Sequence, residues 1–385
     1  MISAHEFVDR ARDVGFTWYA GVPCSFLTPF INYVIGDDSL TYVSAANEGD
    51  AVAAVAGAVI GGRGGVAMMQ NSGLGNAVSP LTSLAYVFRI PMLIICTHRG
   101  APGLADEPQH ELMGMITGQQ FDTMRIPWEY FPTSSEEISA SLSRAAKHFA
   151  EHKRPYALVM KKGSVAPHEL ENPVAAKRNR ATVIDGPAYG TQSLKGLPSR
   201  TAALQMIIDS TPLSDSVVLA TTGFTGRELY AAADRDNHFY MVGSMGCASS
   251  LGVGLALARP DLRVIVVDGD GAALMRMGNL ATIGAYAGGN LTHILLDNEA
   301  HDSTGSQATV SAHVDFASIA MACGYACVHR AMDAEGLQNF LKSRTTDGPQ
   351  FLHLKIKTGT IENLPRPSIT PVAVFERLKR HIGQT

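Results

Sequence analysis

The side chains best suited to hold a metal ion follow two apolar runs in the second half of the chain. Asp270 stands in the turn Asp268–Gly271, directly after the run Val264–Val267, and Asn298 comes just past the run Ile294–Leu296. Two buried parallel strands with an amphipathic helix between them are typical of this pattern. Open α/β sheets place their ligands at the carboxyl ends of the strands, so we expect Asp270 and Asn298 to meet there.

The oxygens of Asp270 and Asn298 are hard ligands of the kind that Mg²⁺ prefers. Mg²⁺ usually completes its octahedron with waters and substrate phosphates rather than with protein groups alone. The pair therefore predicts a magnesium site that also takes a phosphorylated ligand. A Gly-Asp-Gly turn on its own is more often structural, and it is the second residue, Asn298, that favours the metal.

Length and composition indicate a well-buried, enzyme-like chain. The 385 residues suggest two domains, and 46% hydrophobic with 17% charged residues is typical of a globular protein. A net charge of −4 gives no reason to expect nucleic acid or an acidic membrane. The five cysteines lack CxxC spacing, so neither a disulfide framework nor a zinc site is indicated. We expect no signal peptide, because the first residues lack a basic stretch and an apolar core. No apolar run approaches the ~20 residues that span a bilayer, and we expect a reduced cytoplasm.

Both halves of the chain alternate strand patterns with helix patterns, which predicts two parallel-sheet α/β domains with helices on both faces. In the first domain, residues 1–163, we expect helices at Asp50–Ile60 and Ala77–Phe88 and strands at Phe16–Ala20, Leu40–Ser44, Gly65–Gln70, Met92–Thr97 and Tyr156–Met160. In the second, residues 200–358, the expected strands are Val217–Ala220, Phe239–Val242, Val264–Val267, His293–Leu296 and Phe351–Ile356.

Two segments outside these domains have their own character. Residues 164–199 are expected to be a linker, because they contain Pro167, Pro173, Pro187, Pro198 and the basic stretch Lys177–Arg180. Residues 359–385 are expected to be a tail that ends in a helix, with Thr370 as its N-cap and Pro371 as its first residue.

Glu48 is the candidate for chemistry in the first half. It stands between an expected strand and a helix of small residues. An acidic residue at a helix start usually serves only to complement the helix dipole. A buried carboxyl whose pKa is raised by desolvation could instead hold a proton for a reaction.

Together, Asp270, Asn298 and Glu48 resemble the cofactor motif of the thiamine-diphosphate enzymes, in which Gly-Asp-Gly is followed by Asn at about this distance. The resemblance implies that Mg²⁺ is held by Asp270, Asn298 and the backbone carbonyl of Ala300. It implies that Glu48 is catalytic and shares a proton with the aminopyrimidine ring of the cofactor. Further cofactor contacts that it implies are Gly269, Gly271 and Ala272. In this family one cofactor is shared by two subunits, so a homodimer or larger homo-oligomer is implied.

Two more segments border the expected site. Gly243-Ser244-Met245 opens a glycine-rich helix, which by itself indicates close helix–sheet packing. The resemblance implies that Met245 wedges under the cofactor, a role that suits a flexible thioether. Gln70 and Asn71 follow a strand and open a helix; they could form an anion-binding turn or, weakly, a dinucleotide site. The resemblance implies that they line the cofactor and substrate pocket.

Several longer segments resemble the phosphonopyruvate decarboxylase family more closely than the sulfopyruvate decarboxylases: Gly21–Ser25, Met69–Asn76, Asp106–His110, Gly269–Met277 and Leu296–Gly305. Asp297 departs from the wider superfamily, where many members have Asn. The implied reaction is decarboxylation of 3-phosphonopyruvate to phosphonoacetaldehyde and CO₂, in the biosynthesis of 2-aminoethylphosphonate or a phosphonate antibiotic. The alternatives are decarboxylation of sulfopyruvate or of another 2-keto acid.

A phosphonate dianion calls for cations, hydroxyls or helix N-termini. The candidates are Ser25, Arg99, His110, Arg276, His301, Ser303 and Thr304. His110, in an expected mobile loop, and His301, just after the metal Asn, are also candidates for catalysis. Arg276 could equally lie on a solvated helix face or in a domain interface, and the loop of His110 could be plain surface.

Three other classes stay open at this level. A dehydrogenase that binds NAD would lack the pairing of Glu48 with Asn298. A non-catalytic regulator that binds the cofactor would be expected to lose Glu48 or Asp270, and both are present. A carboligase such as acetolactate synthase normally carries a central domain and often FAD, for which this chain has no room.

Overall fold

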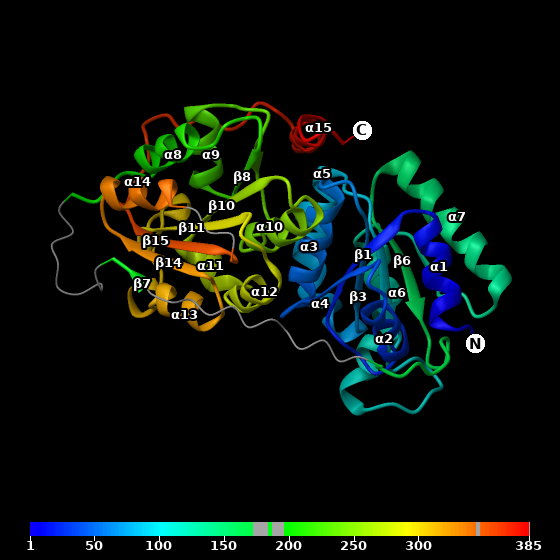
Figure 1. Ribbon diagram of the computed structural model, residues 1–385. Coiled ribbons are helices and arrows are strands. Elements are labelled where there is room, and N and C mark those ends of the chain that lie inside the picture. The colour runs from blue at the N-terminus through cyan, green and yellow to red at the C-terminus, as the bar shows by residue number, and fades with distance from the viewer. Residues whose placement is uncertain (172–183, 187–195, 344–346, 385) are drawn as a thin grey trace. The chain divides into compact units, whose positions relative to one another are not determined.

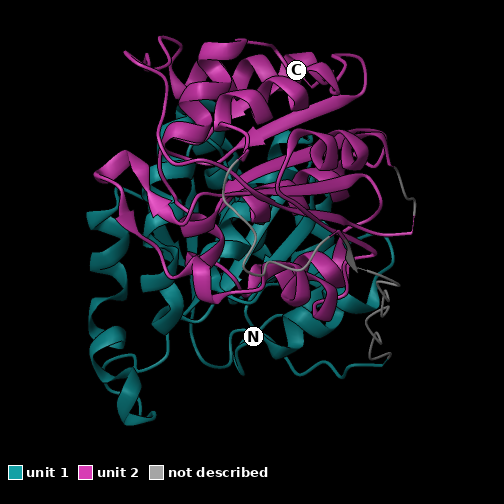
Figure 2. Cartoon of the chain, turned by 90° about the vertical axis from the view of Figure 1, so that its left-hand side faces the viewer, with its two compact units in different colours: residues 1–175 teal, residues 176–385 magenta. Residues whose placement is uncertain are grey.

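The computed structural model describes residues 1–171, 184–186, 196–343 and 347–384. The chain divides into two compact units, unit 1 (Met1–Ala175) and unit 2 (Ala176–Thr385), coloured separately in Figure 2. The predicted linker 164–199 straddles this division, and its residues 173, 177–180 and 187 lie outside the described residues. In the described part of the chain, no helix has the length and apolar character needed to cross a membrane.

Unit 1 is built on a six-stranded sheet in the order β2-β1-β3-β4-β6-β5, and each neighbouring pair is parallel. Its strands are β1 (Phe16–Gly21), β2 (Thr41–Ser44), β3 (Gly64–Met69), β4 (Leu93–Thr97), β5 (Trp128–Tyr130) and β6 (Tyr156–Met160). Its helices are α1 (Ala4–Asp13), α2 (Thr28–Gly36), α3 (Glu48–Ile60), α4 (Leu74–Pro80), α5 (Tyr86–Phe88), α6 (Glu111–Thr123) and α7 (Ser135–His152), with a π-helical turn (Leu81–Ala85) between α4 and α5.

Helices cover both faces of this sheet (Figure 1). Side chains of α1, α2 and α7 form one buried core with strand residues such as Tyr19, Val66 and Leu93. On the other face α3 packs against β1 and β3, and all 13 of its residues are buried. Small residues dominate α3, so the helix can lie close to the strands, and its first residue, Glu48, is carried into the interior with it.

Unit 2 is built on a seven-stranded sheet in the order β7-β14-β15-β11-β10-β8-β9, with a separate two-stranded ribbon, β12-β13. Its strands are β7 (Ile184–Asp185), β8 (Ser216–Ala220), β9 (His238–Tyr240), β10 (Arg263–Gly269), β11 (Leu291–Asp297), β12 (Ala300–His301), β13 (Gln307–Ala308), β14 (Cys327–Ala331) and β15 (Gln350–Lys355). Its helices are α8 (Arg200–Asp209), α9 (Phe224–Ala232), α10 (Ala248–Ala258), α11 (Asp270–Met275), α12 (Asn279–Tyr286), α13 (Phe316–Ala322), α14 (Ala334–Lys342) and α15 (Pro371–His381).

The sheet of unit 2 is also the middle of three layers. Helices α10, α12 and α13 cover one face, and α8, α9 and α14 cover the other (Figure 1). Strands β10 and β11 are parallel neighbours, with Gly269 opposite Leu296. Asp270 and Asn298 therefore leave the sheet at the same edge, as the apolar runs predicted.

The expected α/β fold is confirmed, and so are all ten expected strands to within one or two residues at most ends. Strands β5, β7 and β14 and the ribbon β12-β13 were not predicted. Strand β5 has only three residues, β7 lies in the expected linker, and β14 mixes buried and half-buried positions without an apolar run. The helix expected between β10 and β11 is two helices, because the chain leaves helical geometry at Arg276. Thr370 caps α15 as predicted, by accepting a hydrogen bond from the backbone N–H of Ala373.

Candidate active site

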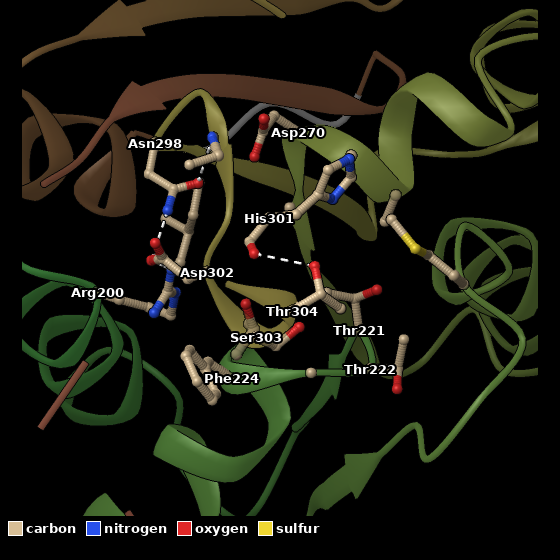
Figure 3. A pocket seen from close by; sticks show the side chains of 18 residues that line it. Arg200, Thr221, Thr222, Phe224, Asp270, Asn298, His301, Asp302, Ser303 and Thr304 are labelled. Atoms are coloured by element: carbon tan, nitrogen blue, oxygen red, sulfur yellow. Dashed lines mark hydrogen bonds and ion pairs between the residues drawn. The ribbon is translucent and has the colours of Figure 1, made fainter. Parts of the chain in front are cut away.

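Loops at the carboxyl ends of β8, β10 and β11 surround a cavity of about 280 Å³ in unit 2 (Figure 3). Of the residues expected at the site, ten line this cavity: Met245, Gly269, Asp270, Gly271, Ala272, Asn298, Ala300, His301, Ser303 and Thr304. Gly243, Ser244 and Arg276 are not among its lining residues. Most of the site residues expected in unit 2 thus lie together at the carboxyl ends of its strands, as the strand-end argument predicted.

Asp270 begins helix α11 and is buried, with 3% of its surface exposed. Burial raises the pKa of its carboxyl group, and the nearby charge of Asp297 adds to that effect, although hydrogen bonds from Thr309 and Ser311 oppose it. No cationic side chain in the described part of the chain pairs with Asp270. A buried carboxylate in this state is stabilised by a cation, so the site fits a bound metal ion.

Asn298 follows β11, and its side chain is fixed by one strong hydrogen bond. Its Nδ2 donates to Oδ2 of Asp302 at 2.6 Å, while its Oδ1 accepts a long bond, 3.4 Å, from the backbone N–H of Ala300. The next residue, Glu299, has a left-handed φ of 59°, which turns the chain back towards the cavity. Asp270 and Asn298 lie on the same side of the cavity in Figure 3.

Asp297, which stands where many members of the wider superfamily have Asn, is held by several hydrogen-bond donors. Its buried carboxylate accepts from His353 at 2.8 Å, Lys355 at 2.7 Å, Ser311 at 2.8 Å and the backbone N–H of Glu299 at 3.0 Å. Burial acts to raise the pKa of Asp297, but the hydrogen bonds and the charges of His353 and Lys355 outweigh it and hold that pKa well below its usual range. Asp297 is thus an anchor of the loop that begins at Asn298.

Close packing of Met245, Gly271 and His301 closes one side of the cavity. A Cβ atom at Gly271 would lie 2.9 Å from Nδ1 of His301 and 3.0 Å from Cε of Met245, so a side chain at this position would displace both. The stem of Arg276, which is not in the cavity lining, covers Gly246. Gly246 has a left-handed φ of 85°, and a Cβ there would lie 2.8 Å from the carbonyl oxygen of Ala272.

The cavity also has walls that the sequence patterns did not suggest: Arg200, Thr221, Thr222, Gly223, Phe224 and Asp302. Thr221–Gly223 directly follow β8, so the same strand-end argument could have found them. Asp302 lies in the segment Leu296–Gly305, although no role was predicted for it. Arg200 had no such signal, because only the folded chain brings the start of α8 to the loop after Asn298. The ion pair of Arg200 with Asp302 measures 2.8 Å, and both side chains are less than a tenth exposed.

Glu48 is buried in unit 1 at the start of α3. Asn76 donates from Nδ2 to Oε2 of Glu48 at 2.8 Å. Gly73 leaves the space that the carboxyl group occupies, since a Cβ there would lie 2.6 Å from Cγ of Glu48 and closer still to the carboxyl atoms. Gly73 and Asn76 belong to the segment Met69–Asn76, so this segment forms the surroundings of Glu48.

Gln70 and Asn71 precede Gly73, and their side chains differ in burial and in hydrogen bonding. The side chain of Asn71 is fully buried and donates to the backbone carbonyl of Arg99 at 2.8 Å and to Thr117 at 3.0 Å. Its oxygen accepts from the backbone N–H of Arg99 at 3.2 Å, so its polar atoms serve the fold. Gln70 is half-buried, and its Oε1 accepts from the thiol of Cys24 at 3.2 Å.

Arg99 follows β4 and already has an anionic partner. Its guanidinium group makes two hydrogen bonds to Asp106, one of them 2.7 Å long from Nε, and a third of 3.1 Å to the hydroxyl of Ser25. The hydrogen bonds from Arg99, with those from Gly100 and Glu107, hold the pKa of Asp106 well below its usual range. The guanidinium group of Arg99, the hydroxyl of Ser25 and the loop that contains Asp106 thus meet at the carboxyl edge of the unit 1 sheet.

His110 ends that loop and is 4% exposed. Its Nδ1 has no hydrogen-bond partner in the described structure. His98, at the end of β4, bonds through Nε2 to the carbonyl of Gly114 at 2.8 Å, which fixes its ring. The Nδ1 of His98, like that of His110, has no partner in the part of the chain that the structure describes, so what sets His98 apart is its bond at Nε2.

Two family models match the chain: the N-terminal TPP-binding domain of thiamine pyrophosphate enzymes over residues 1–122, and the C-terminal TPP-binding domain over residues 222–354. Phosphonopyruvate decarboxylases from Streptomyces viridochromogenes and Streptomyces hygroscopicus are each 44% identical, over 99% and 98% of this chain and 95% and 94% of their own lengths. A sulfopyruvate decarboxylase from Methanosarcina acetivorans is 28% identical over 97% of this chain and 96% of its own.

A solved thiamine-diphosphate-dependent 4-hydroxybenzoylformate decarboxylase from Rhodococcus jostii has the same fold. It superimposes with a TM-score of 0.72 over 93% of this chain and 100% of its own, at 13% sequence identity. At this identity the likeness supports the architecture of the two units.

Proposed function

Since this chain belongs to the phosphonopyruvate decarboxylase family of thiamine-diphosphate enzymes, we propose that it decarboxylates 3-phosphonopyruvate to phosphonoacetaldehyde and CO₂. The reaction makes it a carbon–carbon lyase of phosphonate biosynthesis. The observation that carries the proposal is identity of 44% along nearly the whole of both chains to relatives of that name. The sulfopyruvate decarboxylase is similar over the same extent at 28%, so sulfopyruvate is the second candidate substrate.

We assign Mg²⁺ and the cofactor's diphosphate to the cavity of unit 2. Asp270, Asn298 and the carbonyl of Ala300 would hold the ion, and the buried carboxylate of Asp270, which pairs with no cationic side chain among the described residues, supports a cation there. Thr221 and Thr222 offer hydroxyl groups to the diphosphate from the loop after β8. Met245 and His301 would close the side of the site beside Gly271.

Thiamine diphosphate, when bound, supplies the electron sink that a 2-keto acid needs to lose CO₂. The chain supplies position and proton control. Glu48 would hold a proton on its buried carboxyl group, and Asn76 would keep that group oriented through its bond to Oε2. His110, whose buried Nδ1 has no partner among the described residues, would move a proton to or from the substrate.

Arg99 and Ser25 would bind the phosphonate group, since a guanidinium offers two parallel donors to such an anion. In the structure, Arg99 binds the carboxylate of Asp106, so the substrate and this carboxylate would compete for one cation. His301, Ser303 and Thr304 are the corresponding candidates in unit 2.

We further propose a homodimer or larger homo-oligomer, in which Glu48 of one subunit serves the cofactor held by Asp270 of another. The cytoplasmic location stays a prediction.

The deciding experiment assays phosphonopyruvate, sulfopyruvate and pyruvate in parallel with thiamine diphosphate and Mg²⁺. We expect phosphonopyruvate to have the highest kcat/KM, with phosphonoacetaldehyde identified by phosphorus NMR. Arg99→Met should raise KM for phosphonopyruvate by roughly ten- to a hundred-fold, because a charge-assisted hydrogen bond contributes about 1.5–3 kcal/mol. Equal or better turnover of sulfopyruvate or pyruvate by the wild-type enzyme would contradict the proposed substrate.

A further inference from the structure

The side-chain amide of Asn298 can present its oxygen in only one direction. Nδ2 donates to Oδ2 of Asp302 at 2.6 Å, and a carboxylate oxygen accepts hydrogen bonds but donates none. The nitrogen must therefore face Asp302, and Oδ1 must face the opposite way. Since Oδ1 is the atom offered to a metal ion, the bond to Asp302 decides whether it is offered in the right place (Figure 3).

Asp302 is itself held by two segments that lie outside the metal loop. Its Oδ2 also accepts from Arg200 at 2.8 Å, at the start of α8, and from the backbone N–H of Gly359 at 3.0 Å, beyond β15. Its side chain is only 4% exposed. An anion with three donors on one oxygen has little freedom to turn away from Asn298.

Arg200 is equally constrained. Its other terminal nitrogen donates to Glu228 at 2.9 Å and to the carbonyl of Gly359 at 3.1 Å. Glu228 in turn accepts from Thr201 and Thr360. The guanidinium group thus lies between two carboxylates, of which Asp302 bonds to Asn298 and Glu228 does not.

We propose that Asp302, fixed by Arg200, is a positioning residue for the metal: it orients Asn298 so that Oδ1 is preorganised for Mg²⁺. The inference rests on the proposed role of Asn298 as a ligand. Partners that orient metal ligands are commonly worth about 10- to 100-fold in metal affinity.

The test is a calorimetric Mg²⁺ titration of the full chain in the presence of thiamine diphosphate. Asp302→Ala is expected to weaken Mg²⁺ binding by about 10- to 100-fold. Asp302→Asn keeps an oxygen for Asn298 but loses the charge opposite Arg200, so its loss should be smaller. Glu228→Gln is the matched control, because it perturbs the same arginine without contacting Asn298, and its Mg²⁺ affinity should stay near that of the wild type. Thermal melting identifies any variant that fails to fold, and Asp302→Asn then carries the test alone.

A double-mutant cycle separates the inference from the proposal on which it rests. In the Asn298→Ala background, Asp302→Ala should cause no further loss of Mg²⁺ affinity, because the residue acts through Asn298. Unchanged affinity in Asn298→Ala alone would remove the metal role of Asn298 itself. Two outcomes would overturn the positioning role and leave the ligand assignment intact. In the first, Asn298→Ala weakens Mg²⁺ binding but Asp302→Ala does not. In the second, the double variant loses Mg²⁺ affinity by the product of the two single losses.

Discussion

Gly73→Ala should inactivate the enzyme without altering any group that does chemistry. Gly73 has ordinary right-handed geometry, φ −83° and ψ −8°, so its backbone tolerates alanine. The new Cβ would lie 2.6 Å from Cγ of Glu48, against the 3.4 Å at which ordinary contact begins. The side chain of Glu48 must therefore retreat by about 1 Å or more, and it would leave its hydrogen bond with Asn76.

A displacement of this size is large for a proton-transfer group. A misplacement of about 1 Å can cost ~10²-fold in rate, as can removal of an acid–base group altogether. We therefore expect kcat to fall by about 10²-fold or more. Binding of Mg²⁺ in unit 2 should be little changed, since Gly73 and Glu48 belong to unit 1.

Gly75→Ala provides the matched control. Gly75 lies two residues further along in α4, and a Cβ added there meets no atom within 4 Å. Steady-state decarboxylation and thermal melting of both variants should show an intact fold in each and a loss of kcat in Gly73→Ala alone. Wild-type kcat in Gly73→Ala would refute the argument, because it would mean that the carboxyl group of Glu48 is not needed where it lies.

Three other perturbations test separate parts of the description. Asp106→Asn should lower KM for phosphonopyruvate by about fivefold, equivalent to ~1 kcal/mol, because the carboxylate no longer competes for Arg99; a higher KM would mean that Asp106 builds the site. Co-expressed Glu48→Gln and Asp270→Ala chains should regain activity, since one site of the heterodimer carries neither change; inactive, verified heterodimers would contradict the shared site. Burial lowers the pKa of His238 to about 4 from 6.5, so the unfolded chain takes up the proton first as the pH falls. Because of His238, the free energy of unfolding should fall by about 3 kcal/mol as the pH falls from 6.5 to 4. Denaturant titrations of His238→Gln should show a correspondingly shallower pH dependence.

The sequence predicted what depends on strand ends. Asp270 and Asn298 follow continuous apolar strands of the kind that lie buried in a parallel sheet, and parallel strands all end at the same edge. Glu48 could be identified because a run of small residues follows it, and that run forms a fully buried helix. These features are local, so the chain itself displays them.

Features that depend on distant pairing could not be predicted in this way. The side-chain amide of Asn71, which stays a predicted cofactor contact, bonds to Thr117 and to the backbone of Arg99, and Arg99 is 28 residues away in the sequence. The ion pair of Arg200 with Asp302 joins residues 102 positions apart. Polar residues of this kind have no periodicity that separates a structural partner from a ligand contact.

The contacts of Asp302 also set the limits within which unit 2 can be shortened. The matching family model spans residues 222–354, but Arg200 and Gly359, which hold Asp302, lie before and after it. A fragment cut to residues 222–354 would keep every proposed metal ligand and lose both of the groups that orient Asn298 through Asp302. Anyone who transplants or expresses this half separately should therefore begin no later than Ser199, the N-cap of α8, and continue beyond Thr360.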